Sequence, residues 1–167
     1  MRRSVSRRLD TPLLTLVVTL VTASLFVLSE LAHDGWDAGR FVGAGTTYAD
    51  PAAVPAGLPV GPGGYDGQFY YRIALDPLTT ERTAYGITLD RAAYRQQRIL
   101  YPAAAWALAG GSAERIPLAL IAVNLAAWTL LGWLGALYAR GLGRHALWGL
   151  LFPLYPGFLI TVTRDLT

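Results

Sequence analysis

Hydrophobic residues gather in three long runs that are separated by polar segments. Residues 13–32 and 116–139 are apolar over nearly their whole length. At a rise of about 1.5 Å per residue, each run is long enough to cross a hydrocarbon core of roughly 30 Å. A third run, residues 146–163, is shorter and carries Pro153 and Pro156, which membrane helices tolerate where neighbouring groups bond the freed carbonyls. The pattern predicts an all-α membrane protein with three transmembrane helices.

The arginines around these runs predict their orientation, because cytoplasmic loops of membrane proteins carry the excess of basic residues. Four arginines precede the first run and two lie between the second and the third: Arg2, Arg3, Arg7, Arg8, Arg140 and Arg144. We therefore expect residues 1–12 and 140–145 in the cytoplasm and residues 33–115 as a long external loop. Residues 164–167 would be a truncated end on the outer side. The expected location is the cell membrane, with several passes and a cytoplasmic N-terminus.

A cleaved secretory signal is the alternative for the first run. Val21 and Ala23 are small enough to precede a peptidase site. The apolar run continues past them to Leu28, which favours a membrane span over a cleaved signal.

The external loop is expected to contain short helices after an irregular start. Residues 43–64 include six Gly and four Pro, a composition that disfavours both helix and strand. A short helix is predicted over residues 66–75, with Asp66 as its N-cap. Further helical structure is predicted near residues 90–109. Its last ten residues are apolar, but they are too few to span a membrane, so we expect them to lie at the interface or to re-enter.

Composition excludes several classes of function. The chain has no Cys, so disulfides and thiolate metal sites are excluded. Its two histidines, His33 and His145, fall on opposite sides of the membrane in this topology, which argues against zinc. We predict no metal cofactor, although carboxylates leave a divalent cation open. The external loop holds eight acidic and seven basic residues and is therefore nearly neutral, so we expect no nucleic-acid partner.

One motif in the loop resembles a known superfamily. The run Tyr65-Asp66-Gly67-Gln68-Phe69-Tyr70 is followed by Ile73-Ala74, by Tyr94-Arg95 and by Arg98-Ile99-Leu100-Tyr101-Pro102. Together these segments resemble membrane glycosyltransferases of the GT-C superfamily, in particular bacterial proteins of cell-surface glycopolymer formation. More distantly, they are similar to the mannosyltransferase that adds the second mannose of glycosylphosphatidylinositol anchors. That relative has Trp-Asp-Gly-x-His-Tyr, where this chain has Tyr65 for the Trp and Phe69 for the His, so no role of that His is transferred.

The resemblance implies a substrate class. Members of the superfamily usually have eight or more spans and use a polyprenyl-phosphate sugar as donor. With three predicted spans, this chain would be an N-terminal fragment and would be inactive alone. The implied activity is transfer of a sugar, such as mannose, to a cell-envelope glycan, with membrane lipid, the lipid-phosphate donor and the glycan acceptor as partners.

Sugar transfer needs a base that takes the proton of the acceptor hydroxyl. Asp66 is the predicted base, because Gly67 allows close approach of a substrate and aromatic residues flank it. The competing interpretation is that Asp66 only caps a helix. Asp34 and Asp37, at the outer end of the first span, are alternative positions for the essential acid.

The departing phosphate needs cations. Arg91, Arg95 and Arg98 would share one side of a helix and are predicted to bind the donor phosphate, since a guanidinium matches phosphate oxygens in a fixed fork. The competing interpretation pairs them with Asp90, Glu81 or lipid headgroups. Tyr65 and Tyr70 are predicted to contact sugar, although membrane interfaces are also rich in aromatic residues.

Two other functions compete with the glycosyltransferase. One is a non-catalytic membrane scaffold of an envelope-synthesis complex, with the loop as its docking surface. The other is a transporter, which is disfavoured because the predicted spans carry no Asp, Glu, Arg or Lys near mid-membrane.

Overall fold

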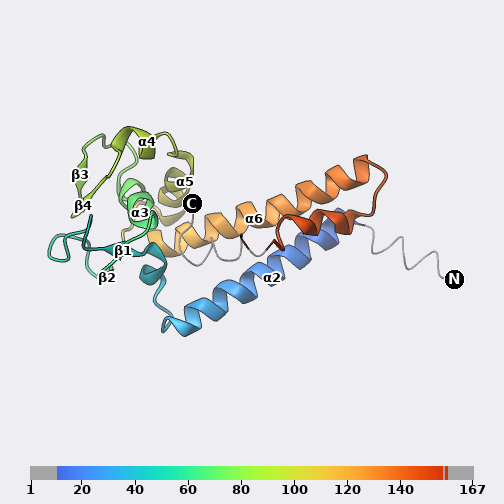
Figure 1. Ribbon diagram of the computed structural model, residues 1–167, viewed down its shortest axis with the longest axis horizontal. Helices are drawn as coiled ribbons and strands as arrows, with labels where there is room; N and C mark the ends of the chain where they lie inside the picture. Colours follow the sequence, from blue (N-terminus) through green and yellow to red (C-terminus); the bar gives the residue numbers. More distant parts are fainter. Residues whose placement is uncertain (1–10, 156, 158–167) are drawn as a thin grey trace. The chain divides into compact units, whose positions relative to one another are not determined.

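The computed structural model describes residues 11–155 and residue 157, which fold into two compact units. Among these described residues, unit 1 comprises residues 11–30, 124–155 and 157, and unit 2 comprises residues 31–123. The described part is mostly helical, and Figure 1 shows the order of its elements. The division falls within the two longest helices, α2 (Pro12–His33) and α6 (Ile116–Gly141).

Both long helices are long and apolar enough to cross a membrane. The exposed side of α2 carries large apolar residues: Leu13 is 66% exposed and Leu25 is 64% exposed. The buried side of its first half carries small or polar residues, with Thr15, Thr19 and Ala23 fully or almost fully buried, and Val27 and Leu31 continue that side toward the end of the helix. A helix of a water-soluble domain has the opposite arrangement, with its large apolar residues inside. The distribution in α2 is typical of a helix that faces lipid.

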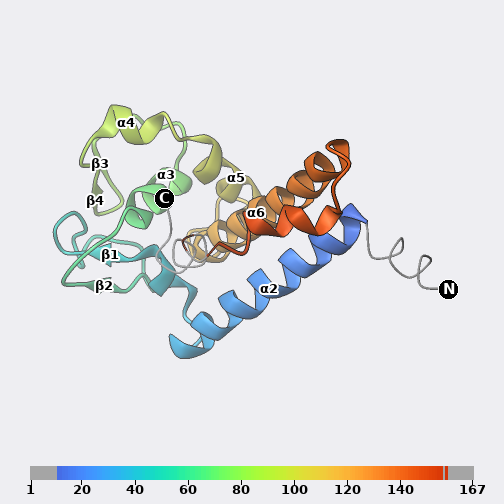
Figure 2. The same cartoon turned by 45° about the vertical axis from the view of Figure 1, so that its right-hand side comes forward.

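Small residues hold unit 1 together. A Cβ added at Gly132 would lie 2.3 Å from Thr19 Oγ1, and one added at Gly149 would lie 2.3 Å from the backbone nitrogen of Ala136. Figures 1 and 2 show α2 and α6 running antiparallel, with the 3₁₀ helix η2 (Ala146–Leu151) beside them. Such close backbone approach is how membrane helices gain packing energy.

The third predicted span is not a continuous helix in the part that the structure describes. Residues 146–151 form η2, and turns follow over residues 152–154. Pro153 has no N–H to continue a helical ladder, and its carbonyl accepts a 2.7 Å hydrogen bond from Trp128 Nε1. Residue 156 and residues 158–163 lie outside the described residues. Two helices of membrane-spanning length are therefore established, and the third span stays a prediction.

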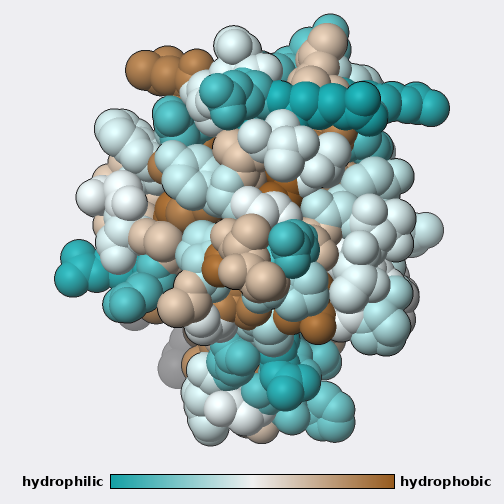
Figure 3. Space-filling view, turned by 90° about the vertical axis from the view of Figure 1, so that its left-hand side faces the viewer, coloured by the Kyte–Doolittle hydropathy of each residue, from teal (hydrophilic) through white to brown (hydrophobic). Residues whose placement is uncertain are grey.

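Unit 2 contains the predicted external segment, and it folds around a core of its own. Its elements are η1 (Ala38–Val42), β1 (Ala44–Gly45), β2 (Val60–Gly61), α3 (Gly67–Leu75), β3 (Thr83–Ala84), β4 (Ile87–Thr88), α4 (Ala92–Gln96) and α5 (Leu100–Ala109). Helix α3 is central, because all its residues from 67 to 74 are buried. The core around α3 includes Phe69, Ile87 and Leu120. Figure 3 views one side of the protein, on which hydrophilic and intermediate surface is broken by small hydrophobic patches.

Two short pairs of strands depart from the all-α prediction. Strands β1 and β2 pair in parallel, with Ala44 opposite Val60, and β3 and β4 form an antiparallel hairpin. The first pair includes part of the segment predicted to be irregular. Glycine makes the local approach possible, since a Cβ on Gly45 would lie 1.2 Å from the carbonyl oxygen of Gly63.

Helices form in the two parts of the loop where the sequence pattern predicted them, but the second part contains two helices. Helix α3 matches the prediction for residues 66–75. The stretch predicted near 90–109 is split into α4 and α5 by turn residues 97–99. Pro102 lies in the first turn of α5, where a missing N–H costs little. The predicted single stripe of three arginines is therefore wrong: Arg91 precedes α4, Arg95 is buried within it, and Arg98 follows it.

The packing of unit 1 predicts unequal effects of two alanine substitutions. A Cβ at position 149 of η2 would collide with the backbone of Ala136 in α6, so Gly149→Ala must push η2 away from α6. We expect this change to lower the free energy of unfolding by about 1–3 kcal/mol. Gly141→Ala is the control, because a Cβ there meets nothing within 4 Å. Thermal unfolding of the detergent-solubilised protein measures both. Equal unfolding temperatures for the two variants would contradict the packing described.

Candidate functional site

The turn before α3 is fixed by a buried glutamine. Gln68 is 1% exposed; its Nε2 donates to the Tyr65 carbonyl at 2.9 Å, and its Oε1 accepts from the backbone N–H of Gly45 at 3.2 Å. The backbone N–H of Tyr65 donates to the Gly43 carbonyl at 2.9 Å. These bonds tie the turn to β1 and set where Asp66 begins the helix. The sequence analysis assigned Gln68 no role.

The side chain of Asp66 does not cap α3. It makes no hydrogen bond to the first N–H groups of the helix, and its backbone carbonyl accepts instead from Phe69 N at 3.0 Å. The predicted side-chain cap is therefore wrong. The carboxylate turns to Arg95, because a bidentate guanidinium offers charge-assisted bonds that a single backbone N–H cannot match.

Arg95 lies between two carboxylates, and we call Asp66, Arg95 and Asp90 the Asp–Arg–Asp cluster. Arg95 Nη1 donates to Asp66 Oδ2 at 2.5 Å, and Nη2 donates to Asp66 Oδ1 at 2.8 Å. Nε donates to Asp90 Oδ1 at 2.8 Å, and Nη2 also donates to Asp90 Oδ2 at 2.9 Å. The guanidinium carbon lies 4.4 Å from the ring centroid of Phe69. The cluster joins α3 to α4.

Exposure differs across the cluster. The side chain of Arg95 is 7% exposed, that of Asp90 24% and that of Asp66 39%. A carboxylate offers about four lone-pair sites, and the two bonds from Arg95 leave others on Asp66. Asp66 is thus held in one orientation while still presenting oxygen lone pairs to solvent.

The pKa values reflect these bonds. The hydrogen bond from Arg95 lowers the pKa of Asp90, although partial burial opposes the shift. The same bond is the main reason that the pKa of Arg95 is raised, with Asp66 contributing further. Both shifts favour the charged forms of Arg95 and Asp90.

A second arginine lies at the surface of the same unit. Arg98 Nη1 donates to the Tyr70 hydroxyl at 3.0 Å, and Nη2 donates to the Tyr94 hydroxyl. Its guanidinium carbon lies 4.7 Å from the Tyr94 ring centroid. The bond to Tyr70 is the main reason that the pKa of Arg98 is raised. Tyr70 itself is only 3% exposed and packs edge-on against Tyr101, so its ring presents no face to a sugar.

The side chains of the other predicted residues do not join the Asp–Arg–Asp cluster in the described contacts. Arg91 is exposed, and its backbone N–H donates to Asp90 Oδ1 at 2.7 Å. Asp37 caps η1, because its carboxylate accepts a 2.8 Å hydrogen bond from Gly39 N. Asp34 lines a separate cavity of about 350 Å³ together with Tyr65. The pairing of Arg95 with Asp90, held open as an alternative to phosphate binding, is confirmed.

One buried cation had no signal in the sequence. Arg72 is fully buried, and its Nη2 donates to the backbone carbonyl of Glu81. Burial lowers its pKa, and burial raises the pKa of neighbouring Tyr71 to about 12. Arg72 lies in a helix that is buried on all sides, and the short sequence motif gives no sign of that burial.

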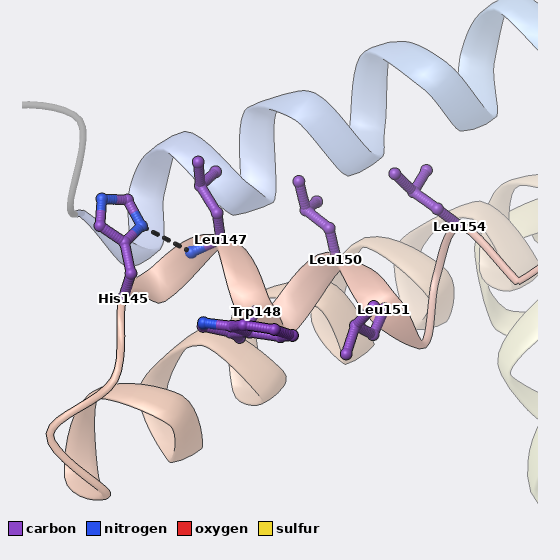
Figure 4. A pocket seen from close by; sticks show the side chains of 6 residues that line it. All are labelled: His145, Leu147, Trp148, Leu150, Leu151 and Leu154. Atoms are coloured by element: carbon purple, nitrogen blue, oxygen red, sulfur yellow. Dashed lines mark hydrogen bonds between the residues drawn. The ribbon is translucent and has the colours of Figure 1, made fainter.

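Unit 1 has a hollow of a different character. It measures about 580 Å³ and is lined by His145, Leu147, Trp148, Leu150, Leu151 and Leu154. Figure 4 shows Leu147, Leu150 and Leu154 along the side of η2 that faces α2, and the 3.3 Å bond from Leu147 N to His145 Nδ1. Among the described residues that line this hollow there is no carboxylate.

Within residues 11–155 and residue 157, no group of three or more His, Cys, Asp or Glu side chains is placed to hold a metal ion.

Comparisons with known proteins identified no relatives of this chain. A scan of protein families and searches of curated proteins and solved structures found no match to this chain. The site must therefore be interpreted from its own geometry.

The cluster predicts a specific loss of stability in acid. Because Arg95 lowers the folded-state pKa of Asp90 below its ordinary 3.8, the unfolded chain binds more protons as the pH falls through this range. The stabilisation is present above that value and is lost below it. We expect the unfolding temperature to fall between about pH 5 and pH 3, and to fall less steeply in Asp90→Asn. Parallel profiles for the two proteins would show that Asp90 carries no such stabilisation.

Proposed function

We propose that this chain forms all or part of a membrane glycosyltransferase of the GT-C type. It would transfer a sugar such as mannose from a polyprenyl-phosphate donor to a cell-envelope glycan on the outer face. Asp66 is the base that takes the proton of the acceptor hydroxyl. The single observation that carries the proposal is that Arg95 holds both oxygens of Asp66 while 39% of that side chain stays exposed.

Such an arrangement suits a base that must act without moving. An enzyme gains rate by holding its catalytic groups in place before reaction, and a bidentate arginine fixes a carboxylate in both position and plane. Arg95 is thereby a positioning residue: between two carboxylates it is a poor phosphate ligand. This divides the roles that the sequence analysis gave jointly to three arginines.

Arg98 is the better candidate for the donor phosphate. It is exposed, and it is held by phenol oxygens of Tyr70 and Tyr94 that carry no formal charge. A guanidinium has five N–H donors, and these two contacts use two of them. The positive charge of Arg98 is therefore available to an incoming anion, whereas that of Arg95 is already neutralised.

The surface of α5 supports a place at the membrane, where a polyprenyl phosphate resides. Leu100 is 82% exposed, Leu108 is 63% exposed and Trp106 is 45% exposed. The residues that α5 buries are Pro102, Ala105 and Ala109. An exposed apolar face beginning two residues after Arg98 matches a helix that lies in the interface with its cation at headgroup depth. In this proposal α2 and α6 span the bilayer, with the N-terminus cytoplasmic.

One observation favours the scaffold as the second candidate. The bonds of the Asp–Arg–Asp cluster also cross-link α3 and α4, which a purely structural element would do equally well. In that case Asp66 contributes stability alone.

Substitution of Asp66 separates the two functions. We expect Asp66→Asn to lower transfer of labelled mannose from polyprenyl-phosphate mannose about 10²- to 10⁴-fold, because the amide cannot accept the hydroxyl proton. Membranes containing the chain, and membranes containing the product of its complete reading frame, provide the assay. The amount of protein in the membrane fraction should not change.

Asp50→Asn is the matched control. Asp50 is an exposed aspartate of the same unit, and its carboxylate accepts only a local bond from Ala52 N among the described contacts. Full transfer by Asp66→Asn would reject Asp66 as the base. If Asp34→Asn or Asp37→Asn lost transfer while Asp66→Asn kept it, that other aspartate would be the base. No transfer by unsubstituted membranes would favour the scaffold.

A further inference from the structure

A cavity is lined in part by Tyr65, the residue before Asp66. It measures about 350 Å³ and belongs wholly to unit 2. Its lining residues include Asp34, Arg40 and Tyr65, together with glycines such as Gly43, Gly63 and Gly64. The volume falls within the roughly 300–1,000 Å³ of sites for small ligands. The Asp–Arg–Asp cluster is not among its lining residues, so it is a second site.

The cavity has a built aromatic wall. The backbone N–H of Tyr65 donates to the Gly43 carbonyl, and its ring lies so close to Gly43 that an added Cβ would be 3.3 Å from it. Gly43 also has a φ of +59°, which favours glycine independently. The ring is nevertheless 51% exposed. Tyr65 is therefore anchored at its base and presents part of its ring to the cavity.

The cavity lining holds one acidic and one basic residue. Asp34 supplies an anion and Arg40 a cation, so the lining has no net charge for a phosphate or a metal ion to neutralise. The side chain of Arg40 is 58% exposed, and its described ion pair with Asp37 is long, at 3.9 Å. A carboxylate accepts hydroxyl protons and a guanidinium donates to hydroxyl oxygens. An aromatic face packs against the C–H groups of a sugar ring.

We infer that this cavity binds a neutral sugar unit of the acceptor glycan, with Tyr65 as the stacking platform and Asp34 and Arg40 as hydroxyl partners. The inference rests on the proposed function, because it names the substrate that Asp66 would deprotonate. Tyr65 precedes Asp66 in the chain, which links the cavity to the residue proposed as the base. The cavity also gives Asp34 a role in recognition, whereas the sequence analysis held it as an alternative catalytic acid.

Binding can be measured without donor or transfer. The probe is methyl α-mannopyranoside, titrated into the full chain in lipid nanodiscs and followed by saturation-transfer NMR. We expect Tyr65→Ala to weaken binding about tenfold or more, and Tyr65→Phe to retain it, because only the first removes the ring face. Arg40→Ala should also weaken binding, whereas Arg115→Ala, which removes an exposed arginine outside the cavity, should not.

Several results would overturn the inference that the cavity binds a neutral sugar. Equal binding by Tyr65→Ala, Arg40→Ala and the unsubstituted chain would overturn it, as would binding of inorganic phosphate in place of the glycoside. Arg40→Ala keeps the test valid if Tyr65→Ala does not fold, since Arg40 is at the surface. Asp66→Asn should bind the glycoside normally while losing transfer. Binding without transfer would reject the proposed function alone, and transfer without binding would reject this inference alone.

Discussion

The ion pairs of Arg95 are the interaction on which unit 2 depends most. An Arg95 side chain that is 7% exposed would be strongly unfavourable without partners, and Asp66 and Asp90 accept four hydrogen bonds from its guanidinium. Those bonds connect the start of the central helix α3 to the short helix α4. They also fix the orientation of the one carboxylate in the cluster that remains well exposed. Stability and the proposed chemistry therefore rest on the same side chain.

Unit 1 follows a different physical rule. Gly132 and Gly149 allow close contacts between its helices, and many of its large apolar residues face outward, although Val27 and Trp128 are buried. Water would penalise such a surface, whereas lipid would not. An apolar surface on the long helices suits hydrocarbon, and a folded segment with buried ion pairs suits water. The proposed membrane-bound enzyme requires both environments.

The sequence predicted the long helices well because their signal is local: a run of apolar residues has the right length whatever it contacts. Helix α3 was equally predictable from Asp66 and Pro77 at its ends. The break between α4 and α5, the pairing of β1 with β2 and the bond of Arg95 to a residue 29 positions away were not predictable. They depend on tertiary contacts, and no local periodicity encodes them. The cap at Asp66 failed for the same reason, since a distant arginine outcompeted the nearest N–H.

The most direct test of this account is a double-mutant cycle between Asp66 and Arg95. The free energy of unfolding is measured for Asp66→Asn, Arg95→Met, the double variant and the unsubstituted protein in the same detergent. If Arg95 holds Asp66 as described, the two substitutions are coupled by about 1–2 kcal/mol, within the range for residues in one ion-pair network. Additive effects would contradict the central claim, because they would mean that the two side chains do not stabilise each other in solution.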